Sequence, residues 1–277
     1  GGGSSSGGGG GGGDGGSSSD GGGSGVCGGA VNAGAENCDS GLWGPTGNNN
    51  MYCYAYGGAN DPCALTITND ANSGLDKDPS NCKGDTFYLW DEPDTQGKDY
   101  AWAGTNWSTY YDKYKSQIDT MRANGVKFTT PLIRSDNLSD NLKAFWAAAG
   151  TSATDKIDAV GINAYCGSWN TNESGELDCG SGASWIANQL TNDLTQGKPV
   201  YITNWSYLGD DSNYDKQKNA INGAGSFFNS GSPVDRVYWF GAKDYGGGTD
   251  DSNFLTTSNG GETLGKLWNT ACKSFSK

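Results

Sequence analysis

The fold is decided by the stretch Thr86-Phe87-Tyr88-Leu89-Trp90, which Asp91-Glu92-Pro93-Asp94 follows directly. Its apolar and aromatic residues, bounded by polar ones, predict a buried β-strand. A helix is predicted next, over Thr105–Ala123, because apolar residues recur there at helical spacing: Tyr110, Tyr114, Ile118 and Met121. A strand followed closely by a helix is the first half of a parallel crossover unit.

The same rhythm continues toward the C-terminus. Further strands are predicted at Val126–Ile133, Ile157–Tyr165, Pro199–Trp205 and Val234–Phe240, and further helices at Ser139–Ala149, Ser184–Thr195, Tyr214–Asn229 and Glu262–Cys272. Strands that alternate with helices pair in parallel through right-handed crossovers. The sequence therefore predicts an α/β fold, a (β/α)8 TIM-barrel-like architecture.

The part before Asp85 is too short for a regular half-barrel. If Thr86–Trp90 is the fourth strand, three units of ~30 residues each should precede it and would need ~90 residues. Residues 26–84 offer about 60, and they are rich in Gly, Asn and Asp, with strand-like runs only at Met51–Tyr56 and Ala64–Thr68. Five cysteines lie in this part: Cys27, Cys38, Cys53, Cys63 and Cys82. We expect an abbreviated N-terminal part that disulfides staple together.

Residues 1–25 contain only Gly, Ser and Asp. One interpretation is a flexible tail, since such a stretch cannot offset the entropy of ordering. The other is an arm for self-assembly, because polyglycine leaves its backbone donors and acceptors free to pair in an assembly. The expected domain organisation is this tail or assembly arm followed by one barrel domain over residues 26–277.

Composition narrows the class of partner. The net charge of −13 disfavours nucleic acid and anionic membranes, and no apolar run is long enough to predict a membrane span. Eight cysteines suggest disulfides and a secreted protein, extracellular or in a cell wall. The chain has no histidine, which excludes Ser-His-Asp and Cys-His catalysis, and we expect no metal and no cofactor. A neutral polysaccharide fits this charge as a partner.

Two covalent modifications are predicted. Cys166 and Cys179 lie in one loop after a strand and should form a disulfide worth ~3 kcal/mol on the chain-entropy model. The six cysteines that remain, Cys272 among them, can pair in 15 ways. We expect Cys272 to pair with a cysteine of the Cys27–Cys82 region. Glycosylation sequons occur at Asn106, Asn137 and Asn172. A fourth sequon, at Asn204, lies at a strand end where burial disfavours a glycan.

Glu92 is the candidate catalytic group. It follows a strand, hence lies at the C-terminal face where barrel active sites form, and Pro93 restricts its backbone. A carboxyl fixed among aromatic residues can have a raised pKa and act as a general acid. The alternative is that Asp91-Glu92-Pro93 is only a helix-capping turn.

The strand followed by Glu-Pro-Asp resembles the acid/base motif of the "glycosyl hydrolase catalytic core" β-1,3-glucanases, family 128. The likeness extends over about two-thirds of the chain, through Tyr110–Ile133, Ile157–Tyr165, Val237–Gly241 and Leu264–Trp268. It implies that Glu92 is the acid/base and that the nucleophile position, a Glu in the family's Thr-Glu-aromatic motif, is Asn204. It also implies that Asn163 or Tyr165 stands where the family has a His. We expect Glu92 and Asn204 to face each other across one cleft.

An amide at position 204 cannot form a glycosyl ester, and retaining hydrolysis needs two carboxyl groups ~5 Å apart. Asp244 could supply the second carboxylate in place of Asn204. Asp210, Asp211, Asp91 and Asp94 could also do so. The alternative for each of these acids is an ordinary solvated side chain. Indole rings at strand ends suit pyranose faces, so we expect Trp90, Trp169 and Trp205, with Asn163 and Tyr165, to bind substrate. The alternative for each ring is core packing.

The favoured function is an extracellular glycoside-hydrolase-like module with impaired catalysis, a glucan-binding or structural component of a wall or filament. The alternative is an active β-1,3-glucanase that uses Glu92 as general acid/base with a non-standard second carboxylate. A third hypothesis, that Asn204 is an engineered replacement of a Glu, leaves the shortened first part unexplained.

Overall fold

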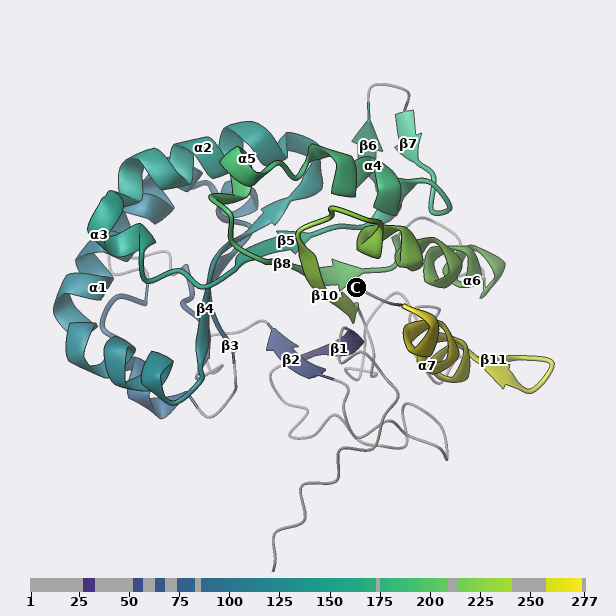
Figure 1. The fold of residues 1–277 in the computed structure, drawn as a ribbon, viewed down its shortest axis with the longest axis horizontal. Helices are drawn as coiled ribbons and strands as arrows, with labels where there is room; N and C mark the ends of the chain where they lie inside the picture. Colours follow the sequence, from purple (N-terminus) through teal and green to yellow (C-terminus); the bar gives the residue numbers. More distant parts are fainter. Residues whose placement is uncertain are drawn as a thin grey trace, which may run out of the picture.

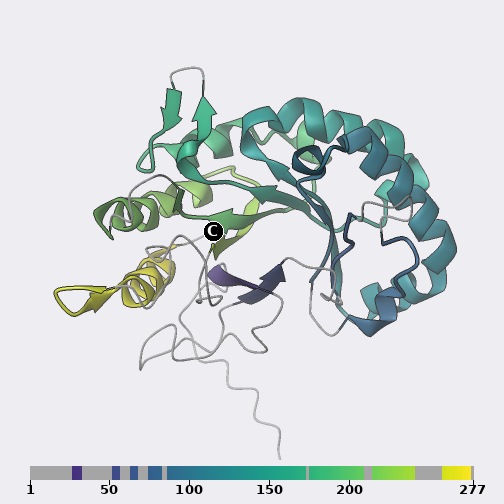
Figure 2. The same ribbon diagram turned by 180° about the vertical axis from the view of Figure 1, so that it is seen from behind.

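A computed structural model describes residues 27–32, 52–56, 63–67, 74–82, 86–172, 175–208, 214–240 and 258–275 (Figure 1). A parallel sheet occupies the centre, and helices lie along its outer side (Figures 1 and 2). Among these described residues, no helix is both long and apolar enough to cross a membrane.

Seven parallel strands form the sheet, in the spatial order β2 (Tyr52–Tyr56), β1 (Cys27–Asn32), β10 (Val234–Trp239), β8 (Val200–Trp205), β5 (Val160–Asn163), β4 (Lys127–Arg134) and β3 (Thr86–Asp91). Ala64 adds a parallel bridge to Tyr88 beyond β3. The first strand therefore lies beside the last, and the segment at Ala64 takes the third of eight positions. This is the strand order of a (β/α)8 barrel, as the sequence predicted. In that order β3 is the fourth strand and β8 the seventh.

The helices follow the predicted rhythm with shifted bounds. They are α1 (Tyr100–Ala123), α2 (Leu138–Ala149), α3 (Thr151–Thr154), α4 (Gly182–Gln189), α5 (Asn192–Thr195), α6 (Tyr214–Gly223) and α7 (Leu264–Ser274). The described residues also include four 3-10 turns: η2 (Pro79–Asn81) and η3 (Pro93–Gln96) precede α1, η4 (Ser135–Asn137) precedes α2, and η5 (Ala224–Phe228) follows α6. The single helices predicted over Ser184–Thr195 and Tyr214–Asn229 each divide in two, the second where α6 tightens into η5.

α1 starts five residues before the predicted bound because Asp99 caps it. The Asp99 carboxylate accepts a hydrogen bond from the backbone N–H of Trp102, which satisfies one of the free donors of the first turn. Further along, Gly104 brings α1 against α2. A Cβ atom at Gly104 would lie 2.5 Å from the carbonyl oxygen of Phe145 and 2.8 Å from the backbone nitrogen of Ala149. The absence of a side chain there permits the close crossing.

The core has two parts. A large cluster fills the layer between sheet and helices, and its fully buried side chains include Trp107, Phe128, Phe145, Trp205 and Trp239. A smaller, separate cluster takes one residue from each of six successive strand positions: Ala64, Tyr88, Leu132, Ala159, Tyr201 and Tyr238. Because strand side chains alternate between faces, these six occupy the inner face, away from the helices.

Disulfides hold the abbreviated N-terminal part. Cys27 of β1 is bonded to Cys272 of α7, so the last helix is tied to the first strand as expected, and Cys63 is bonded to Cys82. The hydroxyl groups of Tyr110 and Tyr114 on α1 donate to backbone carbonyls of the segment 74–82, over 2.7 Å each. This segment is thus held to α1 by hydrogen bonds and to the segment around Ala64 by the Cys63–Cys82 disulfide, where a regular unit would use a helix.

A second, three-stranded sheet is formed by segments that follow β5 and β8. It consists of β7 (Gly175–Leu177), β6 (Cys166–Asn172) and β9 (Tyr207–Leu208), while β11 (Ser258–Asn259) and β12 (Glu262–Thr263) form a separate hairpin. In Figure 1 the β6–β7 hairpin projects beyond the main sheet, next to α4. The predicted strand Ile157–Tyr165 therefore ends early, at Asn163, and Tyr165 lies in the connection to β6.

Candidate functional site

The end of β3 is bent by two residues in the left-handed region. Trp90 has φ 44° and Glu92 has φ 38°, values that non-glycine residues adopt only at a cost of about 1–3 kcal/mol each. The pairing of β3 with β4 also shifts register between Leu89 and Asp91. In a regular strand, the side chains of Asp91 and Glu92 would point to opposite faces. The bend instead brings both carboxyl groups to the same side-chain amide, that of Asn163.

Asn163, the last residue of β5, is the centre of the site. Its Nδ2 donates to Oδ1 of Asp91 over 2.8 Å and to Oε1 of Glu92 over 2.9 Å. Its Oδ1 accepts from Oγ1 of Thr203 over 2.6 Å and from Nδ2 of Asn204 over 3.0 Å. An amide nitrogen only donates and an amide oxygen only accepts. The two carboxyl groups therefore fix the orientation of Asn163, and Asn163 in turn fixes that of Asn204.

Asn204 lies wholly inside the protein, with 0% of its surface exposed. Its Nδ2 makes a second hydrogen bond, of 2.9 Å, to Oη of Tyr165, whose ring packs edge-on against Phe240. Its Oδ1 is buried and has no hydrogen-bond partner within the described residues. The side chain that β8 contributes is thus a neutral amide held by two hydrogen bonds.

Glu92 and Asn204 are brought together by this network. Glu92 follows the fourth strand, and Asn204 is the second-last residue of the seventh. Each is hydrogen bonded to Asn163. Asn163 and Tyr165 join them, as expected from the sequence. The site therefore lies at the C-terminal ends of β3, β5 and β8, the face on which barrel enzymes place their chemistry.

Burial changes the acidity of both carboxyl groups. It raises the pKa of Glu92 to about 7, with the Asp91 charge acting in the same direction and the Asn163 amide and Arg134 opposing them. Burial likewise raises the pKa of Asp91 above its usual range, against the hydrogen bond from Asn163. A carboxyl group that stays protonated near neutral pH can donate a proton or a hydrogen bond to a glycosidic oxygen.

Three charged or titratable groups surround this pair. The Oη atom of Tyr100 on α1 donates to Oδ1 of Asp94 over 3.1 Å, and burial raises the pKa of Tyr100. Arg134, at the end of β4, forms a 2.8 Å ion pair with Asp136. Of these three residues, the sequence points only to Asp94, as a possible substitute carboxylate.

Two of the predicted sugar platforms are core residues, which corrects that expectation. Trp205 is 0% exposed; its Nε1 donates to the carbonyl oxygen of Ala220 over 2.8 Å and its ring packs edge-on against Phe227. Trp90 is also 0% exposed and packs against Trp102. Neither ring has a free face, because the end of each strand turns the indole toward the outer layer.

Other predicted residues lie partly or wholly beyond the described structure. Trp169 and Asn172 belong to β6, but their side chains are not described. Asp244, Asp210 and Asp211 lie outside the described residues. Of the remaining sequon residues, Asn137 is exposed, while Asn106 is half-buried and its Nδ2 donates to the carbonyl oxygen of Trp102.

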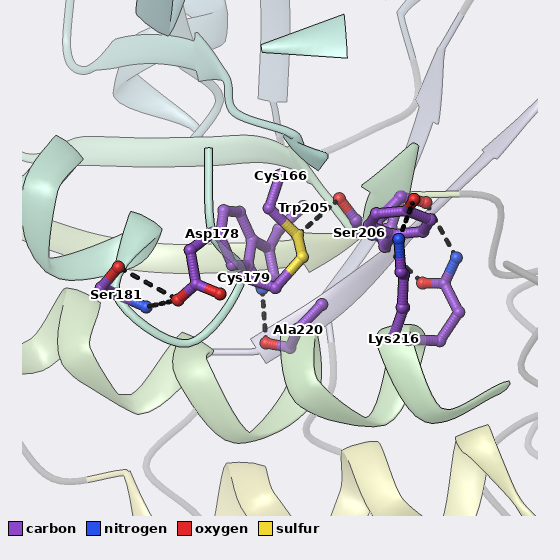
Figure 3. The surroundings of a disulfide bond; sticks show 10 residues. Cys166, Asp178, Cys179, Ser181, Trp205, Ser206, Lys216 and Ala220 are labelled. Carbon is purple, nitrogen blue, oxygen red and sulfur yellow. Dashed lines mark hydrogen bonds between the residues drawn. A yellow bond between two sulfur atoms is a disulfide. The ribbon is translucent and has the colours of Figure 1, made fainter. Parts of the chain in front are cut away.

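The predicted Cys166–Cys179 disulfide is present, with an S–S distance of 2.02 Å. Figure 3 shows it between the β6 strand and the start of α4, beside Trp205 and Ser206. Nearby, Nζ of Lys216 on α6 donates to Oη of Tyr207 over 2.8 Å, which ties β9 to α6. The disulfide starts one residue after Tyr165 and so anchors the connection that carries this hydroxyl group.

The role of Asp91 was the least predictable feature of the site. Its sequence neighbour Glu92 was the expected acid, and strand alternation places consecutive side chains on opposite faces. The left-handed backbone at Trp90 and Glu92 brings the carboxyl groups of Asp91 and Glu92 to the one amide of Asn163. Within the described ranges, no three His, Cys, Asp or Glu side chains converge as metal ligands.

Comparisons with known proteins show the family of the chain and its fold. A family profile described as "Glycosyl hydrolase catalytic core" matches residues 71–268. Two GH128 β-1,3-glucanases share the fold with a TM-score of 0.55. One is a curdlan-specific exo-β-1,3-glucanase of subgroup III from Blastomyces gilchristii, at 16% identity over 91% of this chain and 99% of that chain. The other is a subgroup IV endo-β-1,3-glucanase from Lentinula edodes, at 15% identity over 90% and 99%.

A third similar structure is a GH128 subgroup VII oligosaccharide-binding protein from Cryptococcus neoformans. It has a TM-score of 0.51 and 17% identity, over 91% of this chain and 96% of that chain. Among curated protein sequences, none is similar enough to this chain to count as a match. At such identities, the three structures establish a common fold.

Proposed function

This chain belongs to the glycosyl hydrolase catalytic core family, and we propose that it is a secreted β-1,3-glucan-binding member with little or no hydrolytic activity. Its ligand site is the carboxyl and amide network of Asp91, Glu92, Asn163, Asn204 and Tyr165. Its role is to hold a glucan chain, in a wall or an extracellular filament, without cleaving the chain at an enzymatic rate.

The observation that carries this proposal is the state of Asn204. We assign it the nucleophile position on the family resemblance, and it is a neutral amide engaged with Asn163 and Tyr165. A retaining glycosidase needs a carboxylate that attacks the anomeric carbon and leaves again. An amide forms no glycosyl ester, and losing a nucleophile removes the covalent route that splits one difficult step into two easier ones.

Related structures support a carbohydrate ligand. A subgroup I endo-β-1,3-glucanase from Amycolatopsis mediterranei, with a TM-score of 0.53, is described in complex with laminaritriose. The Cryptococcus neoformans protein is described as oligosaccharide-binding. The same fold thus accompanies both enzymes and a binding protein, so fold alone leaves the activity of this chain to its own residues.

Secretion is proposed from the disulfides. Three cysteine pairs are bonded within the described residues, and disulfides persist in oxidising compartments. The Gly- and Ser-rich residues 1–25 fit a spacer or an assembly arm that places the barrel in a wall. A polysaccharide is the partner that this acidic, disulfide-bonded domain suits best.

An active β-1,3-glucanase is the second candidate, and the acidity of Glu92 favours it. A pKa of about 7 suits a general acid at neutral pH. Hydrolysis would then use a second carboxylate to activate water at ~6.5–9.5 Å from Glu92. Asp244, Asp210 and Asp211 are the candidates for that group.

Two measurements on the purified chain test the proposal. Laminari-oligosaccharide binding is measured by isothermal titration calorimetry, and release of reducing ends is followed over hours. We expect saturable binding with no release above a protein-free control. Turnover at an ordinary enzymatic rate of about 1–1000 per second would establish the second candidate instead. If the chain shows no binding and no release, both candidate functions are rejected.

A further inference from the structure

We infer that Asp91 and Glu92 work as one unit, a pair of carboxyl groups that holds a single proton and recognises the hydroxyl groups of the sugar. One member of the pair donates a hydrogen bond and the other accepts one. This inference rests on the proposed glucan-binding function and names the residues that hydrogen bond to the sugar. It gives Asp91, which the family resemblance leaves without a role, a part in specificity.

The distance between the two carboxyl groups is the first argument. Oδ1 of Asp91 lies 2.8 Å and Oε1 of Glu92 lies 2.9 Å from the same nitrogen, Nδ2 of Asn163. The two oxygens are therefore less than about 6 Å apart. Two carboxylates at this separation, both partly withdrawn from water, repel each other strongly enough that one of them keeps its proton.

The backbone supplies the second argument. Trp90 and Glu92, on either side of Asp91, both have positive φ angles. This strain costs free energy, and relaxing it would return the two side chains to opposite faces of the strand. The fold maintains a costly conformation whose consequence is the pairing of two acids.

The free atoms of the pair are the third argument. Within the described residues, Oδ2 of Asp91 and Oε2 of Glu92 take part in no hydrogen bond, and both residues are partly exposed. The inner oxygens thus face the protein while the outer ones are left for a ligand. One acid and one carboxylate supply one donor and one acceptor, which matches two neighbouring hydroxyl groups of a neutral pyranose.

Asn204 gives an independent indication that this network is built for a ligand. It is fully buried, its side chain points at Asn163, and its Oδ1 lacks a partner in the described part of the chain. A buried polar atom without a partner calls for an explanation, and a polar group of a bound ligand would supply the missing partner. Asn163 joins this amide to the two acids in one hydrogen-bonded network.

Four further titratable or charged groups face the pair from the elements around it. They are Asp94 in η3, Arg134 at the end of β4, Tyr100 on α1 and Tyr165 after β5. Arg134 is engaged with Asp136, and Tyr100 donates to Asp94. Asp94 raises the pKa of Glu92 and Arg134 lowers it, and both act less strongly than burial and the charge of Asp91.

Laminaritriose binding, measured by calorimetry between pH 5 and pH 9, tests the pair. For the wild-type chain, affinity should be constant at low pH and should fall as pH rises through the pKa of Glu92, which is about 7. Glu92→Gln keeps one acceptor and one permanent donor, so it should bind with an affinity that does not change with pH. Asp91→Asn keeps the acceptor for Asn163 but removes the charge, so its affinity should begin to fall at a lower pH than that of the wild type. Asp140→Asn, an exposed acid on α2, is the control and should follow the wild type.

A second readout needs no ligand. The carboxyl carbon of Glu92 is followed by NMR titration in the wild type and in Asp91→Asn, where its midpoint should move toward the usual range of a glutamate. Equal midpoints in the two proteins would overturn the shared proton. Affinity that falls with pH in Glu92→Gln would overturn the role of the pair in binding. If the midpoint moves but no protein binds laminaritriose at any pH, the paired acids stand and the glucan-binding function fails.

Discussion

The side-chain amide of Asn204 donates a hydrogen bond of 2.9 Å to the phenolic oxygen of Tyr165, at the C-terminal end of the barrel. Neither side chain is a carboxylate, so this end of the site offers no group that could attack an anomeric carbon and form a glycosyl ester. All of the negative charge described in the network lies at its other end, on Asp91 and Glu92. The first prediction follows from this asymmetry.

Replacing Asn204→Glu should raise the hydrolysis of β-1,3-glucan above that of the wild type. The change restores a carboxylate within reach of Asn163, and a Glu92 that stays protonated near pH 7 already supplies the acid. Reducing-end release from laminari-oligosaccharides measures the effect. Asn204→Gln is the matched control, because it has the same length without the charge and should stay at background. Equal rates for the two variants would show that position 204 is not the nucleophile position.

Glu92 should also make the free energy of unfolding depend on pH. Folded Glu92 keeps its proton up to about pH 7, against an ordinary value of 4.5, so the folded state binds more protons than the unfolded state between these limits. The free energy of unfolding should therefore fall as pH rises from 4.5 to 7. Glu92→Gln removes this loss and should be more stable than the wild type by about 1–3 kcal/mol at pH 8, and about equal to it at pH 4.

Urea denaturation at the two pH values measures this difference. Glu262→Gln, at an exposed glutamate in β12, serves as the control and should show no gain that depends on pH. A Glu92→Gln variant that is less stable than the wild type at pH 8 would contradict the buried, costly carboxyl described here.

Gly104→Ala should destabilise the protein even though alanine is the better helix former. Helix propensity favours alanine by about 1 kcal/mol. The new Cβ atom would lie 2.5 Å from the carbonyl oxygen of Phe145, and the overpacking of two helix backbones costs about 1–3 kcal/mol. We expect a net loss, measured as a lower denaturation midpoint. Thr109→Ala, on the exposed side of the same helix, should gain a few tenths of a kcal/mol.

The disulfides should differ in their contribution according to the loop that each one closes. Cys166–Cys179 has a sequence separation of 13 and Cys27–Cys272 a separation of 245. On the chain-entropy model, these correspond to about 3 and about 5 kcal/mol. Double alanine variants of each pair, compared by urea denaturation, should follow that order. The reverse order would show that strain or residual structure outweighs loop closure.

Glycans should occur at exposed sequons only. In a host that glycosylates secreted proteins, we expect mass spectrometry of peptides to find a glycan on Asn137, which is exposed, and none on Asn204. Asn137→Gln should remove the modification and leave the fold intact. A folded protein that carries a glycan on Asn204 would contradict the burial of this side chain.

The architecture could be predicted from the sequence because its signals are local. Apolar runs such as Thr86–Trp90 and helical spacing such as that of Thr105–Ala123 report burial directly, and their alternation leaves few topologies. β1 escaped prediction because Cys27–Asn32 begins with two glycines after the cysteine, a composition typical of loops. Its neighbours β2 and β10 determine its conformation, and no local pattern reports them.

Motifs in the sequence pointed to some residues of this network, but not to the hydrogen bonds that join them. Glu92 and Asn204 were identified from motifs at strand ends. The burial of Trp205 against Phe227 and the pairing of Asp91 with Glu92 depend on which way a strand turns after its last regular residue. That turn is decided by backbone angles at Trp90 and Glu92, which tertiary contacts impose against local preference.

The bond between Cys27 and Cys272 gives the barrel an unusual mechanical property. It joins the first strand to the last helix, so the two places where the chain enters and leaves the domain are covalently linked. Tension applied to the segments on either side passes through two side chains and one S–S bond, and the barrel between them bears none of it. Under oxidising conditions, pulling on these two segments would therefore leave the network of Asp91, Glu92 and Asn204 undisturbed. Under reducing conditions, the same force would begin to unravel β1 and α7.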